Sequence, residues 1–289
     1  YRRVLLIGGL GFLGKNLYIN LKQAGYTTHI LSDILPDSTD YFLTVADSND
    51  IIQGDFRDTK LLTDLIPNYS YVFCFAGLSG AKSSLNRPIE DNEINCIAHL
   101  NFLEVCKKVN PNVHIVFPST RLVYGKPQYL PVDEKHPLEP ESLYAVHKLT
   151  AEYYYKIYFK IYNIRSIILR ISNPYGPFQS FNNASYGILN WFIYQALRKK
   201  EIKLFGKGDQ KRDYLFINDL ADLMIRLIEN PELFNSEVYN VGFGRGISLY
   251  EGLMTIKKHI TDLTITMVPW PDTEGKIETG DYYSNIGAI

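Results

Sequence analysis

The chain has 289 residues, of which 46% are hydrophobic, and a formal net charge of −1. This length is enough for a sizeable core and for two domains. No basic excess indicates a nucleic-acid partner, no apolar segment reaches the ~18 residues of a membrane span, and the first apolar run is too short for a signal peptide. Three cysteines, Cys74, Cys96 and Cys106, lie in apolar runs without the spacing of metal ligands, which favours reduced thiols in a cytoplasmic protein.

The first apolar run, 4–7, ends in a glycine-rich turn, and an amphipathic segment follows it. In such a strand, turn and helix, Gly8 would allow the sharp turn, Gly11 the close approach of a pyrophosphate, and Gly14 the packing of helix on strand. A glycine triplet alone is equally typical of a simple turn. About 20 residues further on, Asp33 closes a second apolar run. A carboxylate there binds the ribose hydroxyls of NAD and repels the extra phosphate of NADP.

Apolar runs and helical patterns alternate through the first 171 residues. The expected strands are 2–7, 27–32, 50–53, 71–75, 113–118 and 165–171. The expected helices lie near 12–24, 58–66, 89–109 and 142–162. This alternation predicts an α/β fold, a Rossmann-type doubly wound parallel sheet with helices on both faces.

Residues 173–187 break this pattern with Pro, Gly, Asn and Ser, as an interdomain linker or a binding loop would. The remaining expected elements are a helix near 187–199, a strand at 202–205, a helix from residue 219 and a helix near 248–260. We expect an N-terminal nucleotide-binding domain and a smaller, discontinuous substrate-binding cap, formed by 1–172 with 213–241 and by 173–212 with 242–289. Because the chain lacks an initiator Met, we also expect the natural chain to extend beyond these ends.

Two of the expected helices are unusually apolar. The segments 94–105 and 149–162 carry apolar side chains on more than one face, whereas a helix that covers its own sheet needs only one apolar face. This surplus favours a homodimer that forms through the helices near 89–109 and 142–162. The alternative is that the aromatic side chains fill a large core.

Tyr144 and Lys148 are the sharpest candidates for chemistry. Four residues apart on an expected helix, they share one face. A cation lowers the pKa of a nearby phenol, and with an oxidised nicotinamide it would make Tyr144 a general base toward a sugar hydroxyl. The same spacing also occurs by chance on solvated helix faces. Thr120 closes a strand at the sheet edge where ligands bind, and its hydroxyl would share the substrate proton. His147 lies about 100° around the helix and is interpreted as structural.

Further motifs follow in chain order. They are Gly54-Asp55-Phe56-Arg57-Asp58, Phe75-Ala76-Gly77, Ser84-x-x-x-Pro88 with Asn95, Ser119-Thr120 with Val123-Tyr124-Gly125, Arg170-x-x-Asn173-Pro174-Tyr175-Gly176-Pro177, Arg212-Asp213-Tyr214 with Asp219-Leu220, and Asn240-Val241-Gly242 with Ser248-Leu249. With the glycine turn, Asp33 and the Tyr144–Lys148 pair, they resemble the extended short-chain dehydrogenase/reductase family, the NAD-dependent epimerases and dehydratases of nucleotide sugars. The resemblance covers nearly the whole chain.

The resemblance implies NAD as cofactor and a nucleotide-diphosphate sugar as substrate, without a metal. The residues that it implies for cofactor binding are Gly8, Gly11, Phe12, Leu13, Gly14, Asp33, Asp55, Phe56, Phe75, Ala76, Gly77, Asn95 and Lys148. Those for catalysis are Tyr144, Lys148 and Thr120. Candidates for substrate binding are Lys82, Thr120, Tyr144, Asn173 and Arg212. Of these, Arg212 would meet the diphosphate with its fork of donors or lie on the surface, and Lys82 is equally typical of a solvated side chain.

The two residues after Thr120 separate the subfamilies. Nucleotide-sugar 4,6-dehydratases of this family usually carry Asp-Glu there, and decarboxylases usually keep the Glu, whereas this chain has Arg121-Leu122. Two activities fit, 4-epimerisation of a UDP-hexose-like sugar through a transient 4-keto sugar, or NAD(P)H-dependent reduction of a 4-keto sugar. Asp33 favours NAD and therefore the epimerase. A non-catalytic NAD-binding protein on the same fold is the remaining alternative. The base and the sugar depend on cap loops around 178–190 and 242–280, and Phe178 stands where a small residue is common.

Overall fold

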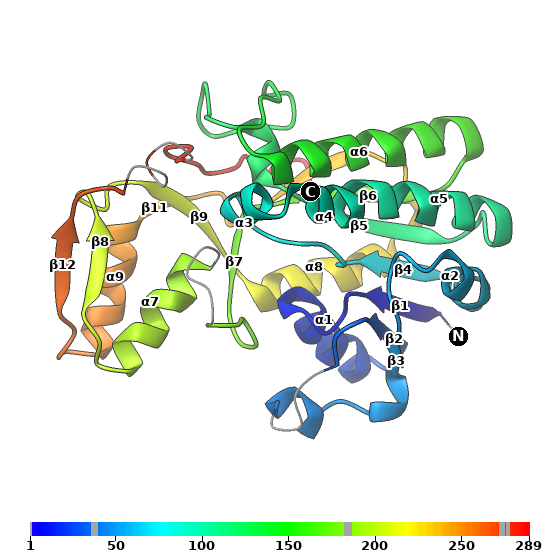
Figure 1. The fold of residues 1–289 in the computed structure, drawn as a ribbon, viewed down its shortest axis with the longest axis horizontal. Helices are drawn as coiled ribbons and strands as arrows, with labels where there is room; N and C mark the ends of the chain where they lie inside the picture. The colour runs from blue at the N-terminus through cyan, green and yellow to red at the C-terminus, as the bar shows by residue number, and fades with distance from the viewer. Residues whose placement is uncertain (1, 36–39, 182–186, 272–274, 276–277) are drawn as a thin grey trace.

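The computed structural model describes residues 2–35, 40–181, 187–271, 275 and 278–289. Parts of both expected cap loops, 182–186, 272–274 and 276–277, lie outside the described residues. Figure 1 shows a larger part built on one sheet and a smaller part with its own short strands and helices. This arrangement confirms the expected fold class, whereas the domain boundaries stay a prediction.

The larger part is centred on a seven-stranded parallel sheet with the order β10-β6-β5-β4-β1-β2-β3. Its strands are β1 (Arg3–Ile7), β2 (Thr27–Ser32), β3 (Ile51–Gln53), β4 (Tyr71–Cys74), β5 (His114–Thr120), β6 (Ser166–Ile171) and β10 (Val238–Val241). Six of them confirm the expected strands. The strand β10 was not predicted, because its four residues at the sheet edge carry too short a hydrophobic pattern.

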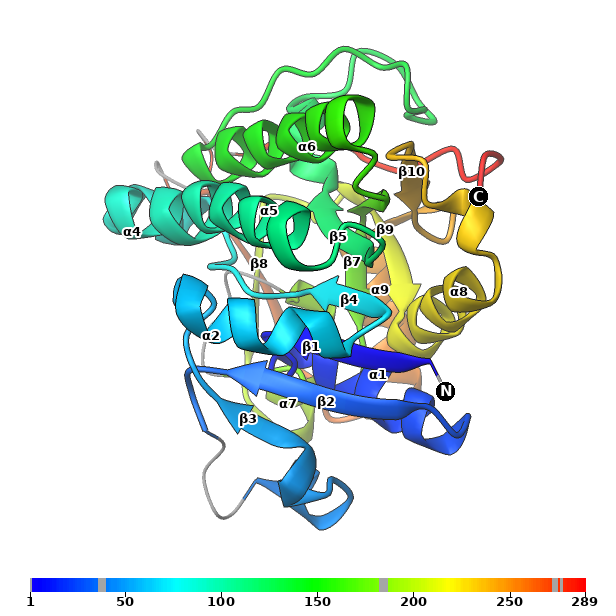
Figure 2. The ribbon, with the colours of Figure 1, turned by 90° about the vertical axis from the view of Figure 1, so that its right-hand side faces the viewer.

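Helices cover both faces of this sheet. They are α1 (Phe12–Gln23), α2 (Thr59–Leu65), α5 (Ala98–Val109), α6 (Leu143–Tyr162) and α8 (Ile217–Glu229). Alternate strand residues face opposite sides, so Val4 and Leu6 pack toward α1 and α8, whereas Leu5 and Ile7 pack toward α2, α5 and α6. Figure 2 shows α5 and α6 on one side of the sheet and α8 on the other.

The segment between β4 and α5 departs from the expected single helix. It forms α3 (Ala81–Asn86), α4 (Pro88–Asn92) and a π-helical turn, Glu93–Ile97, before α5 begins. The hydrophobic period of the sequence does not distinguish a π turn from an α-helix over five residues. Such turns often occur at functional sites, and this one carries Asn95.

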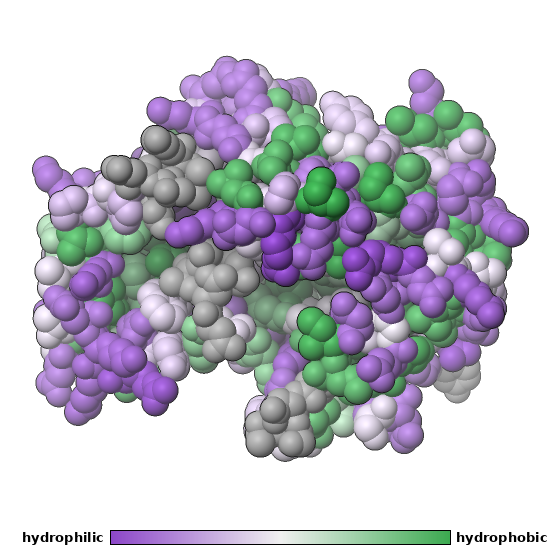
Figure 3. Space-filling model, in the orientation of Figure 1, coloured by the Kyte–Doolittle hydropathy of each residue, from purple (hydrophilic) through white to green (hydrophobic). Residues whose placement is uncertain are grey.

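The smaller part has its own core. Its elements are β7 (Asn173–Tyr175), α7 (Ile188–Leu197), β8 (Ile202–Phe205), β9 (Lys211–Phe216), β11 (Gly246–Ser248), α9 (Leu249–His259) and β12 (Ile265–Val268). The order β11-β9-β7 forms one sheet, and β12 pairs with β8 in another. Phe192, Leu204 and Leu253 are among the buried side chains that join α7, β8 and α9. Figure 3 shows the surface hollowed between the two parts.

Candidate active site

The glycine-rich turn between β1 and α1 is built for close approach of the backbone. Gly8 has a φ of +72°, and a Cβ added there would lie 2.5 Å from the backbone nitrogen of Ala76. A Cβ on Gly14 would lie 2.4 Å from the Cα of Gly9. Gly11 is the N-cap of α1, and it offers no side chain to the first N–H groups of the helix. These N–H groups stay open at the positive end of the helix dipole, as a pyrophosphate requires.

The other cofactor candidates follow the carboxyl ends of neighbouring strands. Phe12 and Leu13 form the first turn of α1 after β1 and pack against the core. Asp33 is exposed just beyond the end of β2. Asp55, after β3, accepts a hydrogen bond of 2.6 Å from Arg57, which holds the pKa of this carboxyl below its usual range. The carboxylate of Asp33 is therefore the more accessible of the two acids.

The two aromatic candidates for cofactor binding, Phe56 and Phe75, lie in different surroundings. Phe56 is buried, with its ring centroid 5.2 Å from that of His99, so its side chain serves the core. Phe75 follows β4, and its N–H donates to the carbonyl of Ile7 at 2.8 Å. This bond holds the loop after β4 against the end of β1, which places Ala76 directly beside the glycine turn.

Asn95 in the π-helical turn has an unused acceptor. Its Nδ2 donates to the carbonyl of Leu78 at 2.9 Å, whereas its buried Oδ1 has no hydrogen-bond partner among the described residues. A Cβ on Gly77 would lie 2.5 Å from this Oδ1, so a side chain there would require the Asn95 amide to move. The open helix N-terminus, the space at Gly8 and this unbonded oxygen together fit a dinucleotide such as NAD.

Thr120 and Tyr144 meet where β5 ends and α6 begins. Ser142 caps α6 by accepting the N–H of Ala145 at 3.2 Å, and the N–H of Tyr144 donates to the hydroxyl of Ser84 at 3.2 Å. Thr120 is buried at the end of β5, and its hydroxyl lies close enough to that of Tyr144 to lower the pKa of this phenol as a hydrogen-bonding neighbour. The structure thus brings together the two hydroxyls that the sequence analysis placed at the reaction centre.

Lys148 lies one helical turn after Tyr144 and is buried. Its Nζ is 4.1 Å from the ring centroid of Phe117, a cation–π contact. Burial lowers the pKa of Lys148 to about 8, although Cys74, Glu152 and other neighbours raise it. The ammonium therefore lies in an apolar setting.

The pKa of Tyr144 differs from the expectation. Burial of its hydroxyl raises the pKa, the charge of Asp91 raises it further, and the hydrogen bond with Thr120 lowers it. The net shift is upward, so the protein groups alone do not make this phenol a base near neutral pH. The expectation also counted the positive charge of an oxidised nicotinamide, which would lower the pKa of Tyr144.

A contact between a buried carboxylate and an imidazole beside these residues was not predicted from the sequence. Asp91 is fully buried in α4, and its Oδ1 lies 2.7 Å from Nδ1 of His147. Its Oδ2 has no hydrogen-bond partner within the described residues. His147, interpreted as structural, thus contacts a carboxylate that acts on the pKa of Tyr144. No motif links residues 91 and 147, because only the packing of α4 on α6 joins them.

A second buried ion pair anchors α6 to the sheet. Glu152, one turn after Lys148, accepts from Nε of Arg170 at 3.0 Å and from Nη2 of Arg170 at 2.6 Å. The hydroxyl of Ser119 also donates to this carboxylate. Because Ser119 precedes Thr120 on β5, the pair fixes the register of α6 against the end of β5.

The substrate candidates are spread over several elements. Asn173 lies in β7, and its partly buried side chain has an unbonded Oδ1. Lys82 is exposed on α3. Arg212, in β9, is buried, and its Nη2 donates to both carboxylate oxygens of Glu278 at 2.7 and 2.8 Å. Its Nη1 donates to the carbonyls of Lys211 and Gly280. Arg212 is therefore engaged by its own chain, which the sequence analysis did not foresee.

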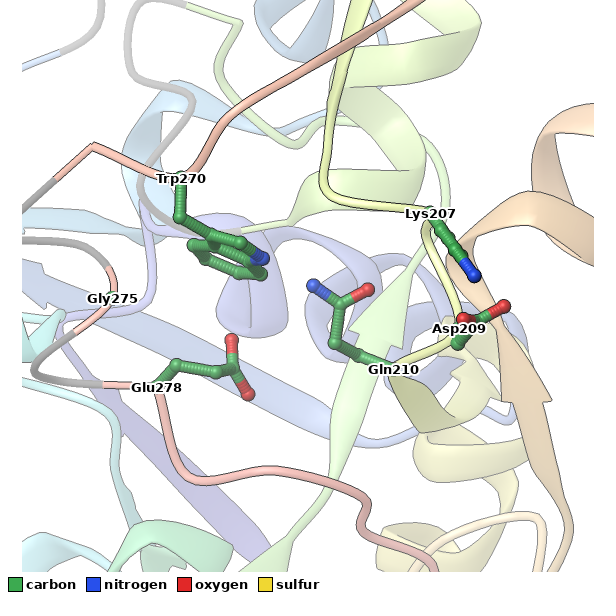
Figure 4. Close-up of a pocket in the computed structure, with 6 residues that line it drawn as sticks. All are labelled: Lys207, Asp209, Gln210, Trp270, Gly275 and Glu278. Atoms are coloured by element: carbon green, nitrogen blue, oxygen red, sulfur yellow. The ribbon is translucent and has the colours of Figure 1, made fainter.

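A cavity of about 500 Å³ lies beside this ion pair. Figure 4 shows Trp270 and Glu278 on one side of the cavity, with Gln210 across from them. Lys207 and Asp209 line its other side. The carboxylate of Glu278 thus separates the guanidinium of Arg212 from the cavity.

Two absences hold for the part of the chain that the structure describes. No group of His, Cys, Asp and Glu there could hold a metal ion. No described helix is long and apolar enough to cross a membrane.

Both a family model and individual known proteins match the sequence of this chain. Residues 4–242 match the model of the NAD dependent epimerase/dehydratase family. The chain is 30% identical to a putative UDP-glucose 4-epimerase of Methanocaldococcus jannaschii, over 89% of this chain and 81% of that protein. It is 27% identical to a CDP-paratose 2-epimerase of Salmonella typhi, over 99% of this chain and 93% of that protein.

The fold also matches solved structures. A UDP-glucose 4-epimerase of Thermus thermophilus, in complex with NAD, superposes with a TM-score of 0.84 at 25% identity. The match covers 98% of this chain and 90% of that one. The names of these three proteins all describe nucleotide-sugar epimerases, with either UDP or CDP as the nucleotide and either carbon 4 or carbon 2 as the reacting carbon.

Proposed function

Since the chain belongs to the NAD-dependent epimerase/dehydratase family, a group of extended short-chain dehydrogenases/reductases that act on nucleotide sugars, we propose that it is an NAD-dependent nucleotide-sugar 4-epimerase with a UDP-hexose-like substrate. One observation carries the proposal. The hydroxyls of Thr120 and Tyr144 meet at the carboxyl end of β5, with the buried ammonium of Lys148 one helical turn away. This set suits proton transfer at a single hydroxyl.

NAD, when bound, supplies the hydride acceptor and donor for carbon 4 of the sugar. Tyr144 takes the proton of the 4-hydroxyl as that carbon is oxidised, and returns it to the same oxygen when the carbon is reduced from its other face. Thr120 donates a hydrogen bond to the reacting oxygen. Lys148 holds the nicotinamide ribose and stabilises the tyrosinate electrostatically.

The remaining site residues divide between cofactor and substrate. For NAD we propose the backbone of the turn formed by Gly8, Gly11, Phe12, Leu13 and Gly14, the acids Asp33 and Asp55, the backbone of Phe56, and the residues Phe75, Ala76, Gly77 and Asn95. For the nucleotide sugar we propose Lys82, Asn173 and Arg212. Because Glu278 engages Arg212, the substrate diphosphate must displace this carboxylate or add to the pair.

Dehydration is the less favoured reaction. Elimination of water needs an acid and a base beyond the tyrosine, and neither Arg121 nor Leu122 supplies a carboxyl group. The exposed carboxylate of Asp33 favours NAD over NADP, which supports an enzyme that recycles its cofactor.

The first test replaces the proposed base. Tyr144→Phe removes the proton acceptor and leaves the cofactor residues intact, so we expect turnover to fall by about 100-fold or more with NAD affinity unchanged. Turnover is measured with UDP-glucose and UDP-galactose, and NAD affinity by calorimetry. Near-normal turnover in this variant would contradict the assignment.

A panel of nucleotide sugars then separates the activities. Interconversion of two sugars without added reductant supports the epimerase. Net consumption of NADH or NADPH with 4-keto sugars supports a reductase instead. No reaction across the panel supports a non-catalytic NAD-binding protein.

A further inference from the structure

Arg121 is a buried cation without a carboxylate partner. It follows Thr120 directly and begins a 3₁₀ turn, Arg121–Tyr124. Its Nη1 donates to the hydroxyl of Thr279 at 3.2 Å, and its guanidinium lies 5.0 Å from the ring centroid of Tyr282. Among the described residues, no carboxylate oxygen lies within 4.0 Å of this guanidinium. A buried guanidinium is costly unless an anion compensates its charge.

The neighbouring carboxylates act on Arg121 through space, without a direct bond to it. Burial, and after it the charge of the buried Arg212, lowers the pKa of Arg121 to about 10, although Tyr282, Glu278 and Asp213 raise it. Glu278 binds Arg212 with both oxygens. Asp213 accepts from the N–H groups of Phe243, Gly244 and Ser284 and from the hydroxyl of Ser284. Both carboxylates thus spend their hydrogen bonds on other groups, and among the described residues neither bonds the guanidinium of Arg121 directly.

A polar group without a partner lies beside both arginines. The hydroxyl of Tyr214, on β9, is buried and has no hydrogen-bond partner in the described part of the chain. Burial raises the pKa of Tyr214 to about 12, and Arg212 and Arg121 oppose this shift. An oxygen anion here would accept from this hydroxyl and from the free N–H groups of Arg121.

We propose that Arg121 binds an anionic oxygen group of the nucleotide sugar, with the hydroxyl of Tyr214 as a second donor. The proposal rests on the proposed function, because it assumes that the substrate enters beside Thr120. Since Arg121 is the next residue after Thr120, this anionic group would lie near the carboxyl end of β5. Two parts of a substrate offer such a group, the diphosphate and a carboxylate on the sugar.

The test measures binding and turnover separately. Arg121→Gln removes the charge, Arg121→Lys keeps the charge without the planar fork, and Arg198→Gln removes a charge on the far end of α7 as the matched control. Each variant is loaded with NAD, checked for its unfolding temperature, and titrated calorimetrically with UDP-glucose, UDP-glucuronate, UDP and inorganic pyrophosphate. Turnover is then measured with both sugars.

We expect Arg121→Gln to weaken binding by about 10- to 100-fold, Arg121→Lys to weaken it less, and Arg198→Gln to leave it unchanged. A loss with all four ligands assigns the diphosphate to Arg121. A loss confined to UDP-glucuronate assigns a sugar carboxylate and makes a hexuronate the substrate. The proposal is overturned when no ligand binds the wild type more tightly than a folded Arg121→Gln variant. Turnover decides the epimerase separately, because a wild type that binds these ligands through Arg121 without converting them contradicts only the proposed function.

Discussion

Lys148 combines a proposed catalytic role with a cost to stability. The folded protein lowers its pKa to about 8, whereas an unfolded lysine titrates near 10.4. Below pH 8 the side chain is charged in both states, and only the folded state bears the cost of burying that charge. Because the unfolded state binds more protons between about pH 8 and 10.4, the free energy of unfolding rises with pH in this window.

We therefore expect Lys148→Met to abolish turnover and yet stabilise the nucleotide-free protein. The gain is on the order of 3 kcal/mol at pH 7, and it disappears as the pH rises from about 8 to about 10.4. Urea unfolding at a series of pH values measures it. Lys160→Met makes the same change at an exposed position of α6 and should leave stability within about 0.5 kcal/mol of the wild type. A Lys148→Met variant that is less stable at every pH would contradict the cost of the buried charge.

Candidate site residues could be predicted from the sequence where they share a helix face at a fixed spacing or stand at the end of a recognisable strand. Tyr144 and Lys148 share a helix face four residues apart, and Thr120 ends a strand whose apolar pattern is unmistakable. The pairing of Asp91 with His147 and of Glu278 with Arg212 was not predictable. Each joins segments more than 50 residues apart, and a charged residue carries no local signal of which distant partner it meets.

At the scale of elements, one helix organises the site. α6 carries Tyr144 and Lys148 on its first two turns, and Glu152 on the next turn is bound to Arg170 of β6 and to Ser119 of β5. Both charged side chains are almost completely buried, with side-chain exposures of 1% and 2%. The ion pair therefore sets where α6 lies on the sheet, and with it the distance of the tyrosine from Thr120.

Removal of one partner leaves a buried charge uncompensated. We expect Glu152→Gln to lower the free energy of unfolding by about 3–5 kcal/mol, measured by guanidinium unfolding. The double variant Glu152→Met with Arg170→Met removes both charges and should recover most of this loss. Glu90→Gln breaks the exposed pair with Arg87 and should cost less than about 1 kcal/mol. Equal losses in the double and single variants would show that the charge is not the cause.

The main elements were predictable from the sequence because the chain repeats one strong pattern. Buried strands such as β4 and β5 are apolar on both faces, since helices cover the sheet on both sides. The elements that could not be predicted from the sequence are short. The π-helical turn around Asn95 and the strand β10 span four or five residues each, and tertiary packing rather than local pattern decides their conformation.

At the scale of the whole molecule, the outer face of α6 remains apolar after the core is filled. Tyr153, Ile157 and Ile161 follow one another at four-residue spacing on the same side of the helix, and all three are exposed. Ile97, in the neighbouring π-helical turn, is exposed as well. Figure 1 shows α6 along an outer edge of the molecule, and Figure 2 shows α5 beside it. Tyr155 and Tyr158 are apolar positions that the core requires, because both are buried in it. Packing in the core does not account for the exposed apolar side chains of this outer row.

We predict that this row, defined by Tyr153, Ile157 and Ile161, is the interface of a homodimer. Pairing α6 with its copy would remove the exposed side chains from water, and each buried branched or aromatic side chain adds about 1.5–3 kcal/mol. Sedimentation velocity should therefore give the mass of two chains. Ile161→Glu places a charge in the row and should give single chains, whereas Leu197→Glu, at an equally exposed position of α7, should leave the dimer intact. A wild type that sediments as one chain at micromolar concentration would assign the outer row to the monomer surface.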